Sequence, residues 1–161
     1  MKAVTIKILK DELKNRPSAE VLNLCMRLAR FKKENKELLT YLLFEADHEE
    51  SFIAGVKEII DDRFLKINTR TDYFRRKGLR AVLKEAKKFI RYSPKKATEI
   101  ELLLYYCAKM KETVPHMSAT RRIHAIYEKQ MEMIHRKLPT LHEDLQYDFQ
   151  QMIDALEGNG N

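Results

Sequence analysis

Five basic side chains follow one another at helical spacing in the middle of the chain, at intervals of four, four, three and four residues. That spacing places them on one face of an α-helix, where like charges repel by roughly a few tenths of a kcal/mol per pair. The five, called the basic stripe below, are Arg76, Arg80, Lys84, Lys87 and Arg91. Because a helix gains nothing from such a row, we expect the basic stripe to bind an acidic partner.

Three acidic partners fit the basic stripe. The first is the phosphate backbone of a nucleic acid, which cationic side chains bind without recognising the bases. In that case Tyr73 and Tyr92 could stack on unpaired bases. The second is an acidic protein surface. The third is the last helix of the same chain or of a second copy, with Glu143, Asp144, Asp148, Asp154 and Glu157. Without any partner, the stripe would be a solvated face with scattered ion pairs.

The charge of the whole chain depends on this region. Residues 63–96 hold 13 basic and 2 acidic side chains, a net charge of +11, whereas the chain as a whole has a net charge of +7. Residues 138–161 hold five acidic side chains and no basic one. The layout predicts a basic patch on the fifth helix and an acidic last helix.

Two Glu-x-x-His pairs provide the second possible chemistry. They are Glu45 with His48 and Glu132 with His135, each one helical turn apart. In helical di-iron bundles such pairs hold metal together with carboxylates from other helices. Here no supporting carboxylate is specified by the sequence, and the first pair falls at an expected helix end. A metal-dependent bundle enzyme is therefore only a distant alternative, and we predict no catalytic residue, cofactor or metal ligand.

Composition excludes several other classes of protein. Gly and Pro together make up 8 of 161 residues, too few for a Gly-rich phosphate loop or for a sandwich with many tight turns. Two cysteines do not make a disulfide scaffold, and we expect both Cys25 and Cys107 to be buried reduced thiols. No apolar run approaches the ~20 residues that cross a bilayer, and Lys7 and Lys10 interrupt a signal-peptide pattern. We expect a cytoplasmic protein without membrane contact.

Apolar residues recur with a period of 3.6 throughout, which predicts eight helices. Thr69 or Thr71 should cap the fifth helix, Ser93 the sixth with Pro94 at its first position, and Ser118 the seventh. Pro115 should end the sixth helix. The first helix should cover about residues 3–14, and the second should begin at Ser18 and end before a polar break at 32–35. The third should end near Asp47–His48, and an apolar stripe from Phe52 to Phe64 marks the fourth. The last helix should begin at Pro139–Thr140 and stop at Gly158.

These elements predict one all-α domain over residues 1–157, followed by a frayed tail at 158–161. Short connections favour antiparallel packing of neighbouring helices. Both a closed helical bundle and a short α-solenoid of stacked helical pairs fit this pattern. A weak internal repeat, residues 37–41 against 101–105, favours the solenoid, which is similar in general shape to HEAT or armadillo repeats.

Taken together, the sequence predicts a non-catalytic helical binding module. The leading hypothesis is a protein-interaction or scaffold module that binds an acidic protein surface or a second copy of itself. The alternative is sequence-independent binding of nucleic acid through the basic stripe.

Overall fold

The computed structural model describes residues 2–113 and 121–158. In these ranges the chain forms eight α-helices, one π-helical and one 3₁₀ turn, and no strand, which confirms the predicted all-α fold. None of the described helices is long and apolar enough to cross a membrane. The helices are α1 (Ile6–Lys14), α2 (Ser18–Phe31), α3 (Lys33–Thr40), α4 (Glu49–Leu65), α5 (Asp72–Ile90), α6 (Lys96–Thr113), α7 (Arg121–Lys137) and α8 (Glu143–Gly158).

The chain divides into two compact units, residues 1–44 and 45–161. The N-terminal unit holds α1, α2, α3 and most of the π-helical turn Tyr41–Glu45. The C-terminal unit holds α4 to α8 and the 3₁₀ turn Leu138–Thr140. That residues 1–157 fold as a single domain stays a prediction.

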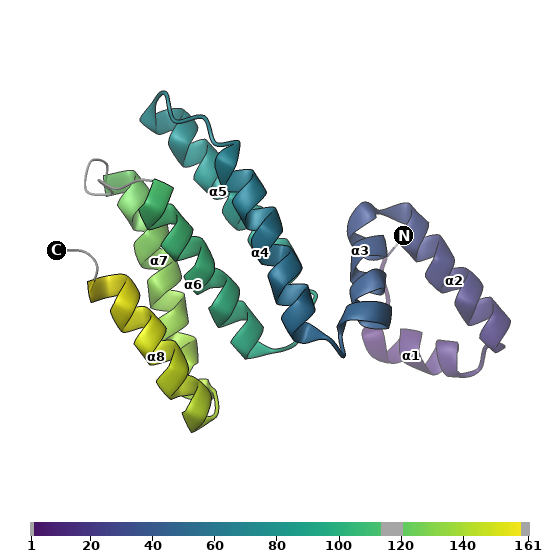
Figure 1. Ribbon diagram of the computed structural model, residues 1–161. Coiled ribbons are helices and arrows are strands. Elements are labelled where there is room, and N and C mark those ends of the chain that lie inside the picture. The colour runs from purple at the N-terminus through teal and green to yellow at the C-terminus, as the bar shows by residue number, and fades with distance from the viewer. Residues whose placement is uncertain (1, 114–120, 159–161) are drawn as a thin grey trace. The chain divides into compact units, whose positions relative to one another are not determined.

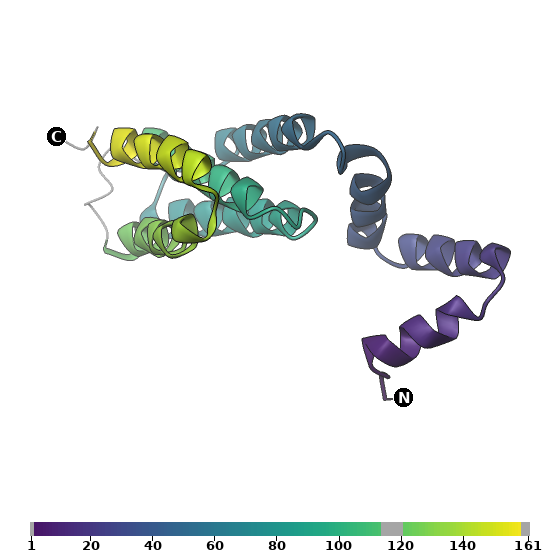
Figure 2. The same cartoon turned by 90° about the horizontal axis from the view of Figure 1, so that it is seen from below.

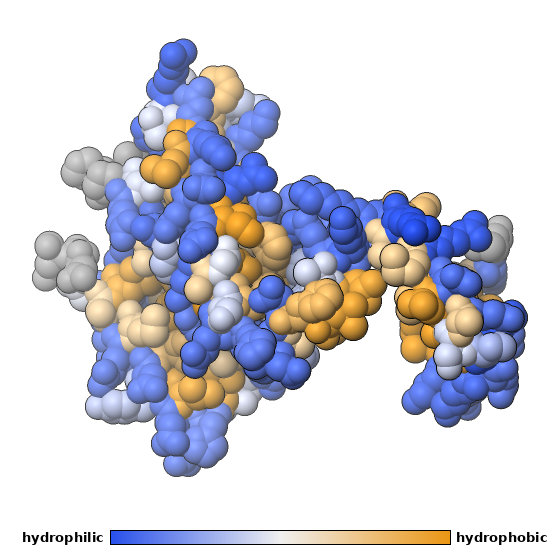
Figure 3. Space-filling model, turned by 45° about the vertical axis from the view of Figure 1, so that its right-hand side comes forward, coloured by the Kyte–Doolittle hydropathy of each residue, from blue (hydrophilic) through white to orange (hydrophobic). Residues whose placement is uncertain are grey.

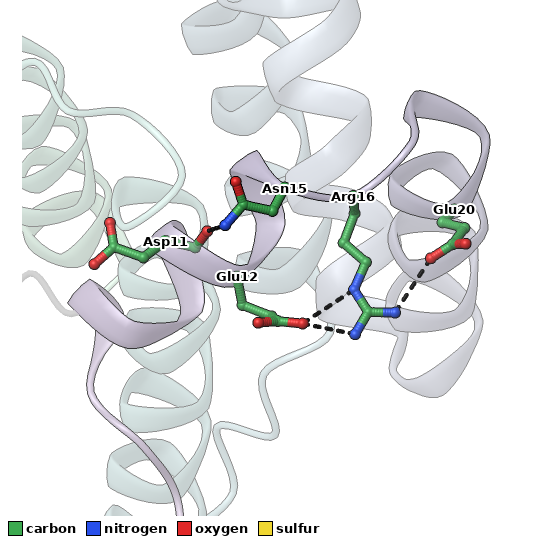
Figure 4. Close-up of polar contacts among 5 residues, drawn as sticks. All are labelled: Asp11, Glu12, Asn15, Arg16 and Glu20. Carbon is green, nitrogen blue, oxygen red and sulfur yellow. Dashed lines mark hydrogen bonds and ion pairs between the residues drawn. The ribbon is translucent and has the colours of Figure 1, made fainter.

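Short polar contacts hold the helices of the N-terminal unit together. Thr5 caps α1 by accepting a hydrogen bond from the backbone N–H of Ile8. Arg16, in the link between α1 and α2, donates to Glu12 at 2.7 Å and to Glu20 at 3.2 Å, as Figure 4 shows. The Asn35 amide donates to the Leu28 carbonyl at 2.8 Å and so ties α3 to α2. These contacts fix the path of the chain but bury little apolar surface.

The C-terminal unit is built around α6. This helix packs against α4, α5, α7 and α8, and α5 also packs against α4 and α7 (Figures 1 and 2). It is buried on several sides, with Leu102, Leu103, Tyr106 and Met110 at most 1% exposed. The Tyr106 hydroxyl donates to the Leu79 carbonyl of α5 at 3.0 Å, which satisfies a polar group inside this core.

Polar contacts join α4 to the segment that leads into α6. One carboxylate oxygen of Glu49 accepts hydrogen bonds from the hydroxyls of Ser93 and Thr98, each at 2.5 Å. Further along, Tyr105 of α6 donates to Asp61 of α4 at 2.7 Å. One prediction is wrong, because α6 begins at Lys96 and not next to Ser93. The Ser93 hydroxyl donates to Glu49 and accepts a hydrogen bond from the Lys95 N–H at 3.1 Å, ahead of the first turn of the helix.

Some of the other helix boundaries agree with the sequence and others do not. The prediction that the last helix begins at Pro139–Thr140 is wrong, because Leu138–Thr140 forms a 3₁₀ turn and α8 begins at Glu143. Thr71 caps α5 through a hydrogen bond from the Phe74 N–H, as predicted. The polar break expected at 32–35 shrinks to Lys32, because α3 already begins at Lys33. Pro115, Ser118 and the last three residues of the expected tail lie outside the described residues.

Candidate binding surfaces

The basic stripe runs along one flank of α5. Arg80, Lys84 and Arg91 are exposed, and Arg76 and Lys87 are half-buried. The helix turns a different side toward the core, with Leu79, Val82, Ala86 and Ile90 buried. The helical spacing seen in the sequence thus corresponds to a continuous row of cations beside the core-facing side.

Lys87 shows which neighbour the basic stripe faces. Its Nζ atom lies 3.8 Å from the Sδ atom of Met133 on α7. Partial burial lowers the pKa of Lys87, and the nearby ammonium group of Lys129 lowers it further, while Glu99 opposes both effects. The basic stripe therefore lies next to α7 and close to further positive charge.

Three of the five acidic side chains of α8 contact residues outside the basic stripe. Glu157 pairs with His135 at 3.4 Å, and Asp154 accepts a hydrogen bond from Gln150 at 2.8 Å. Asp144 pairs with His142 at 3.4 Å. Within residues 2–113 and 121–158, no ion pair joins α8 to the basic stripe. Pairing between the stripe and α8 of a second copy stays a prediction.

The two tyrosines proposed for base stacking lie in different surroundings. Tyr73 is 59% exposed and forms an edge-to-face pair with Phe74, with ring centroids 5.4 Å apart. Tyr92 is only 8% exposed, and its ring packs edge-to-face against Phe89. This corrects the sequence-based expectation, because a ring held in the core by aromatic packing is not available to stack on a base.

The two Glu-x-x-His pairs do not come together with other ligands in the described chain. Across the described ranges, no group of three or more His, Cys, Asp or Glu side chains could hold a metal ion. Glu132 is exposed on α7, and the His135 ring faces Glu157 of α8. His48 stands at the N-cap position of α4, outside the body of the helix.

The most unusual surface belongs to the N-terminal unit and was not predicted from the sequence. Its helices have apolar faces that periodicity marks as buried, yet α1, α2 and α3 contain no buried residue. Among residues 2–44, Tyr41 alone is buried, whereas Ile6 is 79% and Phe31 75% exposed. Figure 3 shows apolar side chains at the surface of this unit. The large exposed apolar residues are Val4, Ile6, Ile8, Leu9, Leu13, Leu22, Leu24, Met26, Leu28, Phe31, Leu42, Leu43 and Phe44.

Two grooves collect part of this apolar surface between α2, α3 and the turn after α3. The first has a volume of about 280 Å³ and is lined by Cys25, Leu28, Ala29, Asn35, Leu38, Leu39 and Leu42. The second, of about 330 Å³, is lined by Met26, Ala29, Arg30, Lys36, Leu39, Thr40, Leu43 and Phe44. No carboxylate of the described chain lines either groove.

The two cysteines differ in exposure. Cys107 is buried in α6, and burial raises the pKa of its thiol to about 12. Cys25 is exposed and lines the first groove, so the expectation of two buried thiols is wrong for this residue. The periodicity of α2 identified its apolar face correctly, but no other part of the N-terminal unit covers that face.

Comparison of the chain with family models, with curated proteins and with solved structures gives no match. Its function must therefore be argued from these surfaces.

Proposed function

We propose that this chain is a cytoplasmic, non-catalytic binding module that engages another protein chain through the apolar grooves of its N-terminal unit. The observation that carries the proposal is that no residue except Tyr41 is buried between residues 2 and 44. Thirteen large apolar side chains of this unit are at least 40% exposed. Such a surface is typical of a protein that is completed by a partner.

The extent of the apolar surface supports a protein partner. The thirteen exposed side chains are spread over α1, α2, α3 and their flanking residues, and together they expose an apolar area on the order of 1,000 Å². A stable protein interface covers about 800 Å² on each partner. Burial contributes about 25 cal/mol per Å², so covering this surface would be strongly favourable. A partner of protein size therefore fits better than a small ligand.

The shape and charge of the grooves define the partner further. Grooves between neighbouring helices accept the apolar face of an amphipathic helix from another chain. Arg30 and Lys36 stand at the second groove, and the N-terminal unit holds ten basic and five acidic side chains. The partner should thus present apolar residues flanked by acidic ones. A second copy of the chain is the self-associating form of the same proposal.

The exposed thiol of Cys25 provides a direct test. We expect maleimide to label Cys25 rapidly in dilute purified protein, since this thiol lines an open groove. Labelling should slow markedly when the protein is still bound to its partner in an extract of the cells that produce it. If the partner is a second copy, the purified protein should show the same protection as its concentration rises.

Two results would contradict the proposal. One is equal labelling rates in purified protein at every concentration and in the extract, which would mean that nothing covers the groove. The other is protection that persists in the purified protein at high dilution, which would mean that the chain covers its own groove. Cys107 serves as the internal control, because its thiol is buried in either case.

A further inference from the structure

The face that α5 and α7 share holds two rows of cations, of which the sequence suggested only one. Met133 of α7 lies against Lys87, and Lys129 stands one helical turn before Met133. On an α-helix, residues three, four and seven apart share a face, so Arg136 and Arg122 belong to this row as well. Arg122, Lys129 and Arg136 are all exposed.

The cations of this face lack acidic partners, in contrast to the cations around it. Nearby, Arg63 pairs with Glu85 at 2.6 Å, and Lys137 pairs with Glu99. On the shared face, seven side chains form no ion pair with any carboxylate of the described chain: Arg76, Arg80, Lys84, Arg91, Arg122, Lys129 and Arg136. Lys87 itself lies near the ammonium groups of Lys129 and Lys137, and Glu99 offsets part of this repulsion.

The same face offers little to a protein partner. The large apolar side chains that α5 exposes, Tyr73 and Phe74, lie in its first turn, and α7 exposes none among its described residues. Protein interfaces depend on a buried core of aromatic and aliphatic anchors. A face of unpaired cations without such anchors is better suited to a polyanion.

We propose that the α5–α7 face binds the phosphate backbone of a nucleic acid, without recognition of base sequence. From Arg76 to Arg91 the helix rises about 22 Å at 1.5 Å per residue. One strand of a duplex presents about six phosphates over this length, at 3.4 Å each. The second row on α7 would neutralise further phosphates. This binding site is separate from the apolar grooves and does not depend on the function proposed for them.

Salt dependence of binding provides the test. The full chain is titrated into a fluorescently labelled duplex, and separately into a labelled single strand, at about 50 to 200 mM salt. We expect a Kd between roughly 10⁻⁶ and 10⁻⁴ M near physiological salt, for mixed sequences alike. The double variant Arg80→Gln/Lys84→Gln should reduce the slope of log K against log salt by about 1.8 on duplex or about 1.4 on single strand. Lys129→Gln should reduce the duplex slope by about 0.9.

A matched control removes the same charge elsewhere. Lys10 and Lys14 are exposed, four residues apart on α1, and Lys10→Gln/Lys14→Gln should leave the slope unchanged. The proposal is wrong if the wild-type chain shows no measurable affinity near physiological salt, or if the control variant loses as much as Arg80→Gln/Lys84→Gln. It is also wrong if poly-glutamate displaces the labelled strand as effectively as an unlabelled strand, which would assign this face to an acidic protein. Circular dichroism of each variant confirms that it is folded.

Discussion

Gly78 of α5 gives the sharpest test of the packing in the C-terminal unit. A Cβ atom at this position would lie 2.7 Å from the Cγ2 atom of Ile67, 3.0 Å from its Cγ1 and 3.3 Å from its Cβ. Ile67 follows the end of α4, and its β-branched side chain has little rotamer freedom. Gly78→Ala therefore forces this segment away from α5.

The matched substitution is Gly55→Ala in α4, where a new Cβ would meet no atom within 4 Å. Each substitution gains about 1 kcal/mol of helix propensity. Overpacking at Gly78 costs about 1–3 kcal/mol in addition. We expect Gly55→Ala to raise the free energy of unfolding by about 1 kcal/mol, and Gly78→Ala to lower it by about 0–2 kcal/mol.

Urea unfolding, followed by far-UV circular dichroism, measures both variants against the wild type. The difference between the two variants cancels the shared propensity gain and isolates the contact with Ile67. If Gly78→Ala stabilises the protein as much as Gly55→Ala does, α5 is not packed against this segment, and the account of the α4–α5 pair is incorrect.

Three further predictions concern single groups. Glu49→Gln should lower the free energy of unfolding, measured in urea, by about 1.5–3 kcal/mol, because the Glu49 carboxylate accepts hydrogen bonds from two buried hydroxyls. Its neighbour Glu50 is exposed, so Glu50→Gln should lower the free energy of unfolding by less than ~0.5 kcal/mol. Equal losses in the two variants would contradict this prediction. Ellman's reagent should react with one thiol, Cys25, in folded protein, and with a second only in urea. The reason is that the thiolate is the reactive form and burial raises the pKa of Cys107 to about 12. Two thiols that react equally fast in folded protein would contradict the burial of Cys107. Folding lowers the pKa of Lys87, so the unfolded chain binds the proton more tightly. The free energy of unfolding should therefore rise with pH between that lowered pKa and 10.5. Lys87→Met should lose part of this rise, and an unchanged pH dependence would contradict the lowered pKa of Lys87.

The sequence was most informative about local structure. The sequence offers Thr69 or Thr71 as the cap of the fifth helix, and Thr71 takes this position, through a contact that depends only on neighbouring residues. The basic stripe was visible for a similar reason, since helical spacing alone determines which residues share a face. Both features follow from the geometry of one helix.

Tertiary contacts account for what the sequence could not show. Ser93 accepts the Lys95 N–H, a local contact, but its hydroxyl also donates to Glu49, which is 44 residues away in sequence and could not be predicted. Lys129 joins the basic surface only because α7 packs next to α5. Periodicity marked the face of α2 that includes Cys25 as apolar, and it does not say whether another element covers that face. The surfaces most relevant to function are the apolar faces that no other element covers, and periodicity alone does not identify them.

The central claim is that another protein chain covers the apolar grooves of the N-terminal unit. Leu28 lines the first groove and is 60% exposed, whereas Leu65 of α4 lies outside the N-terminal unit and is 85% exposed. The most direct measurement is gel filtration of a native extract, which gives the size of the species that contains the wild-type chain, Leu28→Asp or Leu65→Asp. We expect the wild type and Leu65→Asp to elute in a complex larger than the 19.1 kDa chain, and Leu28→Asp to elute as the free chain. Elution of all three at the same size would contradict the account.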